Sequence, residues 1–467
     1  MAEEHQVPSL TEICLQAALQ SEFWRVQRRQ LACLPDVVAN ELLHRLLQQR
    51  RISPPQLELF QCCTHVELSG SSITGPWLAY LGAFPFLQVL RLRSCSKLRD
   101  RHAQHLAALA PSLQELDLTG CSGLGDDTAT ALLCLTSLRS LDLSGTSLGP
   151  GSISSLCSAL TGLTHLGLVD VPADDASCEA IGARLSLLAS LNLAGTAVGD
   201  AGMAHLEQLR SLTALDLSHT QAHCPPGVTS LCQLSMNGCS LGLTDNSTAA
   251  IQWLQPGASL PRLQDLQLAS TSLLPFHGKQ LLHALLAGAA GSLQRLDMRD
   301  GPLGEGLEAL AGATKLTYLD LSGTALTDAQ LPPLALAPLR WASFARTAVG
   351  GDMGADVTAY MTTLTHLDLS NTRSGDGYWP ALAQLPQLKW LDLSGSRLTL
   401  GSLSEGPYEF AALTFLNLNS AQLDNRGCRQ LAASLLQLRE LWLGSKAVED
   451  KGLRALCKLP RCQTLGC

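Results

Sequence analysis

The stretch LTYLDLSGT (316–324) recurs with small changes along the chain, as LQELDLTGC (113–121), LRSLDLSGT (138–146), LASLNLAGT (188–196), LTHLDLSNT (364–372) and LKWLDLSGS (388–396). The copies return at about 25 residues, a period typical of stacked structural repeats. In a strand, alternate side chains point to opposite faces, so the two leucines of L-x-L point inward while the residues around them point outward. The sequence therefore predicts one short strand in each unit.

The repeat extends over most of the chain. The first apolar residue of each central pair falls at 66, 90, 116, 141, 166, 191, 215, 234, 266, 296, 319, 342, 367, 391, 416 and 441, and Leu465 begins a truncated further strand. Apolar residues at helical spacing follow the strands, for example Gly202, Met203, Leu206 and Leu209, or Gly452, Leu453, Leu456 and Leu459. We therefore expect about sixteen strand and helix units over residues 61–467.

This pattern closely resembles the leucine-rich-repeat family over roughly residues 61–467. The resemblance implies an α/β solenoid of about sixteen repeats, with a parallel sheet on its concave side and helices on its convex side. A short helical segment precedes it. Proteins of this architecture bind other macromolecules along an extended surface, so we expect a protein partner on the concave face.

Threonine or cysteine follows most strands, where many such proteins have asparagine. The positions are Thr146, Thr196, Thr220, Thr271, Thr324, Thr347 and Thr372, with Cys95, Cys121 and Cys239 at the same step. A hydroxyl or thiol there can donate to backbone carbonyls at the turn. The pattern resembles the cysteine-containing and ribonuclease-inhibitor-like subclass of repeats. Spacing is irregular over 215–296, where Pro225 and Pro226 predict a loop in place of a helix.

Composition narrows the class of protein. The start MAEEHQVPSLTE has two acids and no apolar core, which is unlike a secretory signal, and no run approaches the ~20 apolar residues that span a bilayer. We expect a cytoplasmic or nuclear protein with no membrane segment. The net charge of −8, without a basic stripe, argues against nucleic acid as a partner.

Sixteen cysteines permit two interpretations. In a reducing compartment they are free, mostly buried thiols, which we favour. The alternative is a set of disulfide-capped ends, which Cys62 with Cys63, or Cys457, Cys462 and Cys467, would imitate. A zinc site at the last three is a poor match, because no histidine lies near. We expect no metal and no cofactor.

Residues 1–60 lack the repeat, so they form either a cap for the solenoid or a docking module. Ser9 and Glu12 have the spacing of a capping box, which predicts a helix from Ser9. The same helix reads Ser-Leu-x-x-x-Cys-x-x-x-Ala and resembles the BC-box by which substrate receptors bind elongin C. In that resemblance Leu10 fills an apolar pocket and Cys14, one turn later, allows close approach of the partner.

A second motif follows. The residues Leu34, Pro35, Val38 and Leu42 resemble the cullin box of cullin-2-type receptors, a helix that begins at a proline. The whole segment is similar to the N-terminal region of zyg-eleven and zer-one type ubiquitin-ligase receptors. Those proteins continue into an armadillo-like domain, whereas the repeats here extend to the last residues, so their substrate preference is not carried over. An F-box, which also begins with Leu-Pro and a leucine-rich helix, is an alternative.

One outward row is aromatic. The residue before the central pair is Tyr318, Trp341, His366, Trp390 and Phe415 in five successive units, and Trp442 follows one step along the next strand. Earlier units have Glu115, Ser140, His165, Ser190 and Ala214 there. Because aromatic residues are only 4% of the chain, their concentration on one exposed line predicts an interface. The alternative is cross-strand packing within the sheet.

The position between the two leucines is often aspartate: Asp117, Asp142, Asp216, Asp297, Asp320, Asp368 and Asp392. Repeats arrange these carboxylates in a row and not in a converging pocket, so we expect no acid/base catalysis and no enzyme activity. The sequence predicts a non-catalytic substrate receptor of an elongin BC and cullin ubiquitin ligase. The alternatives are an F-box receptor, or a free-standing scaffold or inhibitor with a helical cap.

Overall fold

The structure is a computed structural model and describes Glu12, Leu15, Gln16, Leu19 and residues 35–467. The gaps in that range are 71–72, 224–226, 240–259, 272–285, 287, 302, 304–305, 352–354, 357, 359, 401–407, 445–447 and 467. The chain divides into two compact units, residues 1–216 and residues 217–467. The division falls at the beginning of the irregular stretch. The expected loop at Pro225 and Pro226 lies outside the described residues, and the expected boundary near residue 60 stays a prediction.

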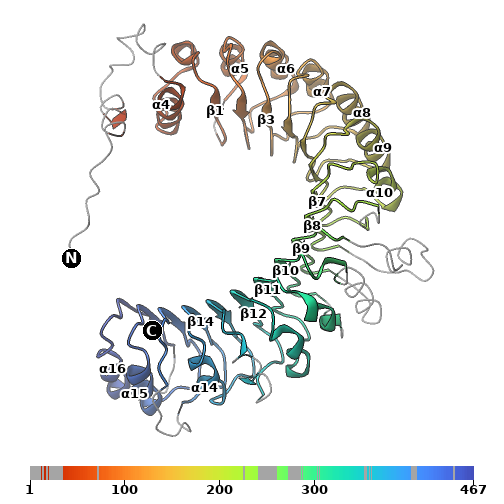
Figure 1. The fold of residues 1–467 in the computed structure, drawn as a ribbon. Coiled ribbons are helices and arrows are strands. Elements are labelled where there is room, and N and C mark those ends of the chain that lie inside the picture. Colours follow the sequence, from red (N-terminus) through yellow and green to blue (C-terminus); the bar gives the residue numbers. More distant parts are fainter. Residues whose placement is uncertain are drawn as a thin grey trace. The chain divides into compact units, whose positions relative to one another are not determined.

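Each repeat contributes one strand of three residues, and consecutive strands within a unit pair in parallel (Figure 1). Unit 1 contains β1 (His65–Glu67), β2 (Val89–Arg91), β3 (Glu115–Asp117), β4 (Ser140–Asp142), β5 (His165–Gly167), β6 (Ser190–Asn192) and β7 (Ala214–Asp216). Unit 2 contains β8 (Gln233–Ser235), β9 (Asp265–Gln267), β10 (Arg295–Asp297), β11 (Tyr318–Asp320), β12 (Trp341–Ser343), β13 (His366–Asp368), β14 (Trp390–Asp392), β15 (Phe415–Asn417), β16 (Glu440–Trp442) and β17 (Thr464–Gly466). The sixteen expected strand positions are the middle residues of β1 to β16, and Leu465 is the middle of β17, so the α/β leucine-rich-repeat fold is confirmed.

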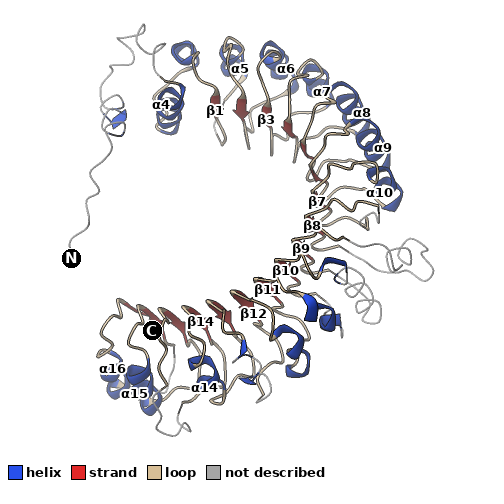
Figure 2. Ribbon diagram, viewed as in Figure 1, coloured by secondary structure: helices blue, strands red, loops and turns tan. Residues whose placement is uncertain are grey.

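Short helices join the strands and cover the other side of each unit (Figure 2). The α-helices of the described residues are α4 (Asp36–Gln48), α5 (Gly75–Leu81), α6 (Asp100–Ala103), α7 (Asp126–Leu132), α8 (Pro150–Ala159), α9 (Asp175–Arg184), α10 (Asp200–Leu206), α14 (Tyr378–Ala383), α15 (Asn425–Ser434) and α16 (Asp450–Leu456). The 3₁₀ helices are η1 (Pro54–Phe60), η2 (Gln104–Leu109), η3 (Gly306–Gly312), η4 (Asp328–Gln330) and η5 (Pro332–Leu334). None of these described helices is long and apolar enough to cross a membrane.

The core of each repeat is leucine. In the third repeat, Leu116 and Leu118 of the strand region and Leu124 of the following turn are at most 2% exposed. The helix side closes tightly: a Cβ at Gly182 of α9 would collide with the carbonyl oxygen of His205 in α10, so only glycine permits this approach. The expected apolar faces are largely confirmed, since Gly202, Met203 and Leu206 of α10 are buried. In α16, Gly452 and Leu456 are buried and Leu453 is half-buried.

The threonines that follow the strands, which we call the threonine ladder, form the hydrogen bonds to backbone carbonyls that the sequence predicted. Each hydroxyl donates to the carbonyl oxygen three residues earlier, at 2.5 to 2.9 Å, in Thr146, Thr196, Thr220, Thr271, Thr324, Thr347 and Thr372. The thiols at the same step reach across to the preceding repeat, since Cys95 donates to the Leu68 carbonyl and Cys121 to the Leu92 carbonyl. Both arrangements satisfy backbone oxygens inside the turn, where water has no access.

A second ladder runs along the helix starts. A carboxylate or amide oxygen at the beginning of one connection accepts from a backbone N–H at the beginning of the next. The acceptors are Asp100, Asp126, Asp175, Asp328, Asp376 and Asn425, and the donors are Gly125, Gly149, Gly199, Gly350, Thr399 and Glu449, at 2.6 to 3.0 Å. These bonds use N–H groups that the next helix leaves free, and they fix neighbouring repeats to each other.

None of the twelve cysteines within the described residues forms a disulfide, as expected, and seven of them are buried. Burial raises the pKa of Cys157 and of Cys178 to about 12, so these thiols stay protonated. Cys62 and Cys63, and Cys457 and Cys462, form no disulfide, which contradicts the capped-end alternative for these residues.

We expect Thr196→Val to lower the free energy of unfolding by about 1 kcal/mol, because the buried Leu193 carbonyl loses the hydroxyl and keeps only the backbone N–H of residue 196 as a donor. Thr213→Val is the matched control in the next repeat. Its hydroxyl also donates to a carbonyl, that of Ala189, but it is exposed and water replaces it. Denaturant titration of the three proteins measures the difference. Equal stability of both variants would contradict a structural role for the ladder.

Candidate functional site

The aromatic row of unit 2 lies on neighbouring strands. Tyr318, Trp341, His366, Trp390 and Phe415 are the first residues of β11 to β15, and each is the register partner of the next. We call these five residues the aromatic ladder. All five side chains are half-buried.

The rings of the ladder form two stacks. Tyr318 and Trp341 have centroids 4.2 Å apart and an interplanar angle of 5°. Trp390 and Phe415 stack at 5.1 Å and 6°, and His366 lies 6.3 Å from Trp390 at 26°. Stacking covers the ring faces between neighbours and leaves the ring edges exposed. The surface is therefore an apolar strip that follows the repeat direction.

Arg295, the first residue of β10, continues the ladder at one end. Its guanidinium carbon lies 3.7 Å from the centroid of the Tyr318 ring, in a cation–π contact. Its Nε is 3.8 Å from Oδ1 of Asp265 on β9. Sequence reasoning missed this cation, although an arginine in the same position one repeat before Tyr318 was a sufficient signal.

Trp442 lies near the other end of unit 2, displaced from the ladder. It is the third residue of β16 and pairs in register with Asn417 and Gly466. A Cβ at Gly466 would contact the indole ring of Trp442, so the ring lies over this glycine. Its side chain is 40% exposed.

The aspartate row has a structural role. Oδ1 of the strand's third residue accepts from the backbone N–H two residues later, as in Asp142 to Ser144 at 2.9 Å and Asp368 to Ser370 at 2.9 Å. Asn192 makes the same bond to Ala194 at 3.0 Å. This hydrogen bond needs an oxygen acceptor and not a negative charge, which favours the structural interpretation of this row over catalysis.

The aspartates of this row differ, however, in whether an arginine forms an ion pair with them. Arg299 forms ion pairs with Asp297 at 2.9 Å and with Asp320 at 3.5 Å. Burial raises the pKa of Asp320, and the Arg299 charge opposes this effect. Among the described residues, no group of three His, Cys, Asp or Glu side chains is arranged to hold a metal ion.

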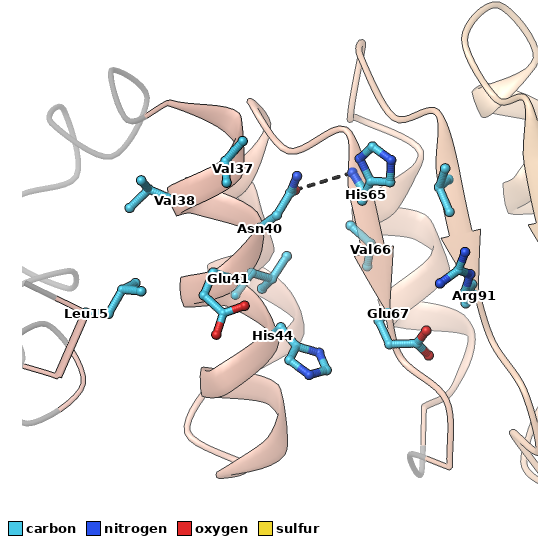
Figure 3. Close-up of a pocket in the computed structure, with 12 residues that line it drawn as sticks. Leu15, Val37, Val38, Asn40, Glu41, His44, His65, Val66, Glu67 and Arg91 are labelled. Carbon is cyan, nitrogen blue, oxygen red and sulfur yellow. Dashed lines mark hydrogen bonds between the residues drawn. The ribbon is translucent and has the colours of Figure 1, made fainter. Parts of the chain in front are cut away.

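A hollow of about 440 Å³ lies at the beginning of unit 1, around α4 and the first two strands. Figure 3 shows Leu15 on one side of α4 and the strand residues His65, Glu67 and Arg91 on the other. Asn40 of α4 accepts from the backbone N–H of His65 at 3.3 Å. This bond fixes α4 against the edge strand of unit 1.

The expected docking residues are only partly described. Leu10, Cys14 and Leu34 lie outside the described residues. Pro35 is exposed directly before α4, and Val38 is half-buried. Leu42 is only 2% exposed, on the face of α4 that also buries Ala39, Leu43 and Leu46. The apolar side chain that α4 exposes most is Val37, at 73%, which the motif did not include.

The described part of the first helix packs against α4. Leu15 and Leu19 are buried, and both carboxylate oxygens of Glu12 accept from the Arg45 guanidinium, at 2.7 and 2.8 Å. The bond from Arg45 lowers the pKa of Glu12. Arg51 also donates to the Leu19 carbonyl. These contacts connect the described residues before Pro35 to α4 and to Arg51.

Comparison with known proteins agrees with the fold. A family model described as leucine-rich repeat matches residues 110–133, 134–157 and 312–329, and no curated protein matches the chain. A leucine-rich-repeat protein of Leptospira interrogans is 21% identical, with a TM-score of 0.54, over 81% of this chain and 95% of that chain. The chain is therefore built of leucine-rich repeats.

Two further solved structures are similar at lower TM-scores. The mouse RP105/MD-1 complex is 18% identical, with a TM-score of 0.48, over 89% of this chain and 68% of that chain. The yeast Rad7 and Elc1 complex is 16% identical, with a TM-score of 0.40, over 99% of each chain. At these identities the likeness concerns the repeat architecture alone.

His366 gives the ladder a pH dependence. Burial, and to a lesser degree the charge of Lys389, lowers the pKa of His366. The unfolded chain therefore binds a proton on this histidine more readily than the folded chain does. As a result, the free energy of unfolding falls as the pH drops below about 6.5. We expect the free energy of unfolding to fall less between pH 7.5 and pH 5.5 in His366→Phe than in the parent protein, as measured by guanidinium titrations at both pH values. His165→Phe, at the same strand position in β5 but exposed, should follow the parent; a flattened profile in both variants would contradict this assignment.

Proposed function

We propose that this protein is a non-catalytic substrate receptor, in which the aromatic ladder of unit 2 binds a target protein. The observation that carries the proposal is the ladder itself, five half-buried rings in register on adjacent strands. Exposed aromatic surface with fixed side chains loses little entropy on binding, and such residues dominate protein interfaces.

We further propose that the N-terminal segment docks an elongin BC and cullin ubiquitin ligase. The support is the order of the two motifs, with Leu10 and Cys14 before the helix that starts after Pro35. In this proposal the cullin contacts the exposed side of α4 around Val37 and Val38. Leu42 acts indirectly, because it is buried and holds α4 in place.

A helical cap without a ligase role is the second candidate. The contacts of Leu15 and Leu19, and the ion pair between Glu12 and Arg45, favour it, because they are what a cap of unit 1 requires. The two candidates share the ladder as target site. They differ in whether Leu10 and Cys14 are available to a partner.

We expect Trp341→Ala and Trp390→Ala to weaken capture of the target by about 30-fold or more, the effect of removing a central tryptophan. The measurement is affinity purification of the tagged full chain with quantitative mass spectrometry, comparing the proteins retained by each variant. Phe86→Ala is the control, since Phe86 is 62% exposed and lies outside the ladder. Retention of the same proteins by parent and tryptophan variants would contradict the target site.

The free energy of unfolding of the same two tryptophan variants distinguishes a binding role of the aromatic ladder from a packing role. The lost stacking should lower the free energy of unfolding by only about 1–2 kcal/mol. In contrast, Phe344→Ala removes a ring that is fully buried behind β12 and should cost about 3–5 kcal/mol. If Trp390→Ala destabilises the protein as much as Phe344→Ala, the ladder is a packing feature.

For the ligase, we expect the full chain to retain purified elongin B and C, and Leu10→Ala and Cys14→Asp each to abolish this binding. The pocket loses its apolar side chain in the first variant and meets a charge in the second. Cys457→Asp is the matched control, because Cys457 also follows a leucine, Leu453, by four residues and is exposed. Binding that survives both changes, or no binding by the parent, would favour the cap.

A further inference from the structure

Three pairs of aspartates are register partners on adjacent strands in the described residues. They are Asp117 with Asp142 on β3 and β4, Asp297 with Asp320 on β10 and β11, and Asp368 with Asp392 on β13 and β14. Adjacent strands lie about 4.8 Å apart, so each pair brings two carboxylates close together on the same face of a sheet. Such neighbours repel each other unless a cation lies between them.

An arginine of the chain bridges one of the three pairs and contacts one carboxylate of another. Arg299 spans Asp297 and Asp320, with Nη2 2.9 Å from one carboxylate and Nε 3.5 Å from the other. Arg93 forms an ion pair with Asp117 in the first pair. Each arginine lies two residues beyond the end of the preceding or the same strand, where its guanidinium reaches over the carboxylates.

The third pair differs. The residues equivalent to these arginines are Ala345, Ser370 and Ser394, each two residues beyond the end of β12, β13 or β14. No Lys or Arg among the described residues forms an ion pair with Asp368 or Asp392. The hydrogen bonds to Asp368 and Asp392 come from the neutral donors Ser370, Ser394 and Asn417.

This third pair lies beside the aromatic ladder. Asp368 is on the same strand as His366, and Asp392 is on the same strand as Trp390, two residues apart in each case. Residues two apart in a strand point to the same face. An apolar strip thus runs alongside two neighbouring carboxylates that the chain itself does not neutralise. Lys389 is exposed and acts on His366, but forms no ion pair with either aspartate.

We infer that the target protein places an arginine across Asp368 and Asp392, in the way that Arg299 spans Asp297 and Asp320, while the adjoining residues of its segment pack on the ladder. The planar guanidinium can bond two carboxylates at once, and its aliphatic stem packs on the exposed edges of Trp390 and His366. The ligand class is a basic, arginine-containing segment of a protein. This inference rests on the proposed target site.

The test selects random twelve-residue peptides, displayed on phage, on the immobilised full chain. We expect the selected peptides to be enriched in arginine and depleted of aspartate and glutamate. Their synthetic versions should bind Asp368→Asn/Asp392→Asn about tenfold more weakly or worse. Asparagine keeps the turn, because Asn192 and Asn417 accept the same backbone bond at this strand position.

Asp117→Asn/Asp142→Asn is the matched control, since it changes a register pair of the same kind in unit 1, and its affinity for the peptides should equal that of the parent. Peptides that depend on Trp390 but lack basic residues, or that bind Asp368→Asn/Asp392→Asn as tightly as the parent, would overturn the arginine contact and leave the target site intact. If no selected peptide loses affinity for Trp390→Ala, both the inference and the target site fail.

Discussion

The inward apolar residue at the middle of each three-residue strand, in most strands a leucine, is the constraint on which the rest of the structure depends. A strand this short buries too little surface to be stable alone, and it gains stability only by pairing with the next repeat. Pairing in parallel and in register brings Leu116 beside Leu141 and Leu391 beside Leu416. Because the leucines fix the register, the outward residues of successive repeats are placed side by side as well.

Because of this register, residues at the same position of successive repeats form continuous rows along each unit. The threonine hydroxyls and the helix-start aspartates become ladders that satisfy backbone groups inside and between repeats. The same geometry produces the aromatic ladder on the strand face of unit 2. Structural and binding roles coexist at one position, since the strand-end aspartate accepts a turn hydrogen bond through one oxygen and leaves charge on the surface.

In the N-terminal segment, α4 has a buried face and an exposed face, and only the exposed face is accessible to a partner. One face of α4 buries Ala39, Leu42 and Leu46, whereas Val37 at its N-terminal end is exposed. A motif written as spaced apolar residues does not distinguish these faces. Any partner of α4 therefore meets a surface that is smaller than the motif alone suggests.

The sequence by itself determined the repeat architecture, the middle residue of every strand and the donors of the threonine ladder. A period of about 25 residues with inward leucines admits only one kind of stacking. The tertiary structure alone decided which ladder rings stack, that Arg295 covers Tyr318, that Leu42 is buried, and which aspartate pair is left without an arginine. These depend on side-chain direction and on contacts between repeats, which spacing along one chain does not encode.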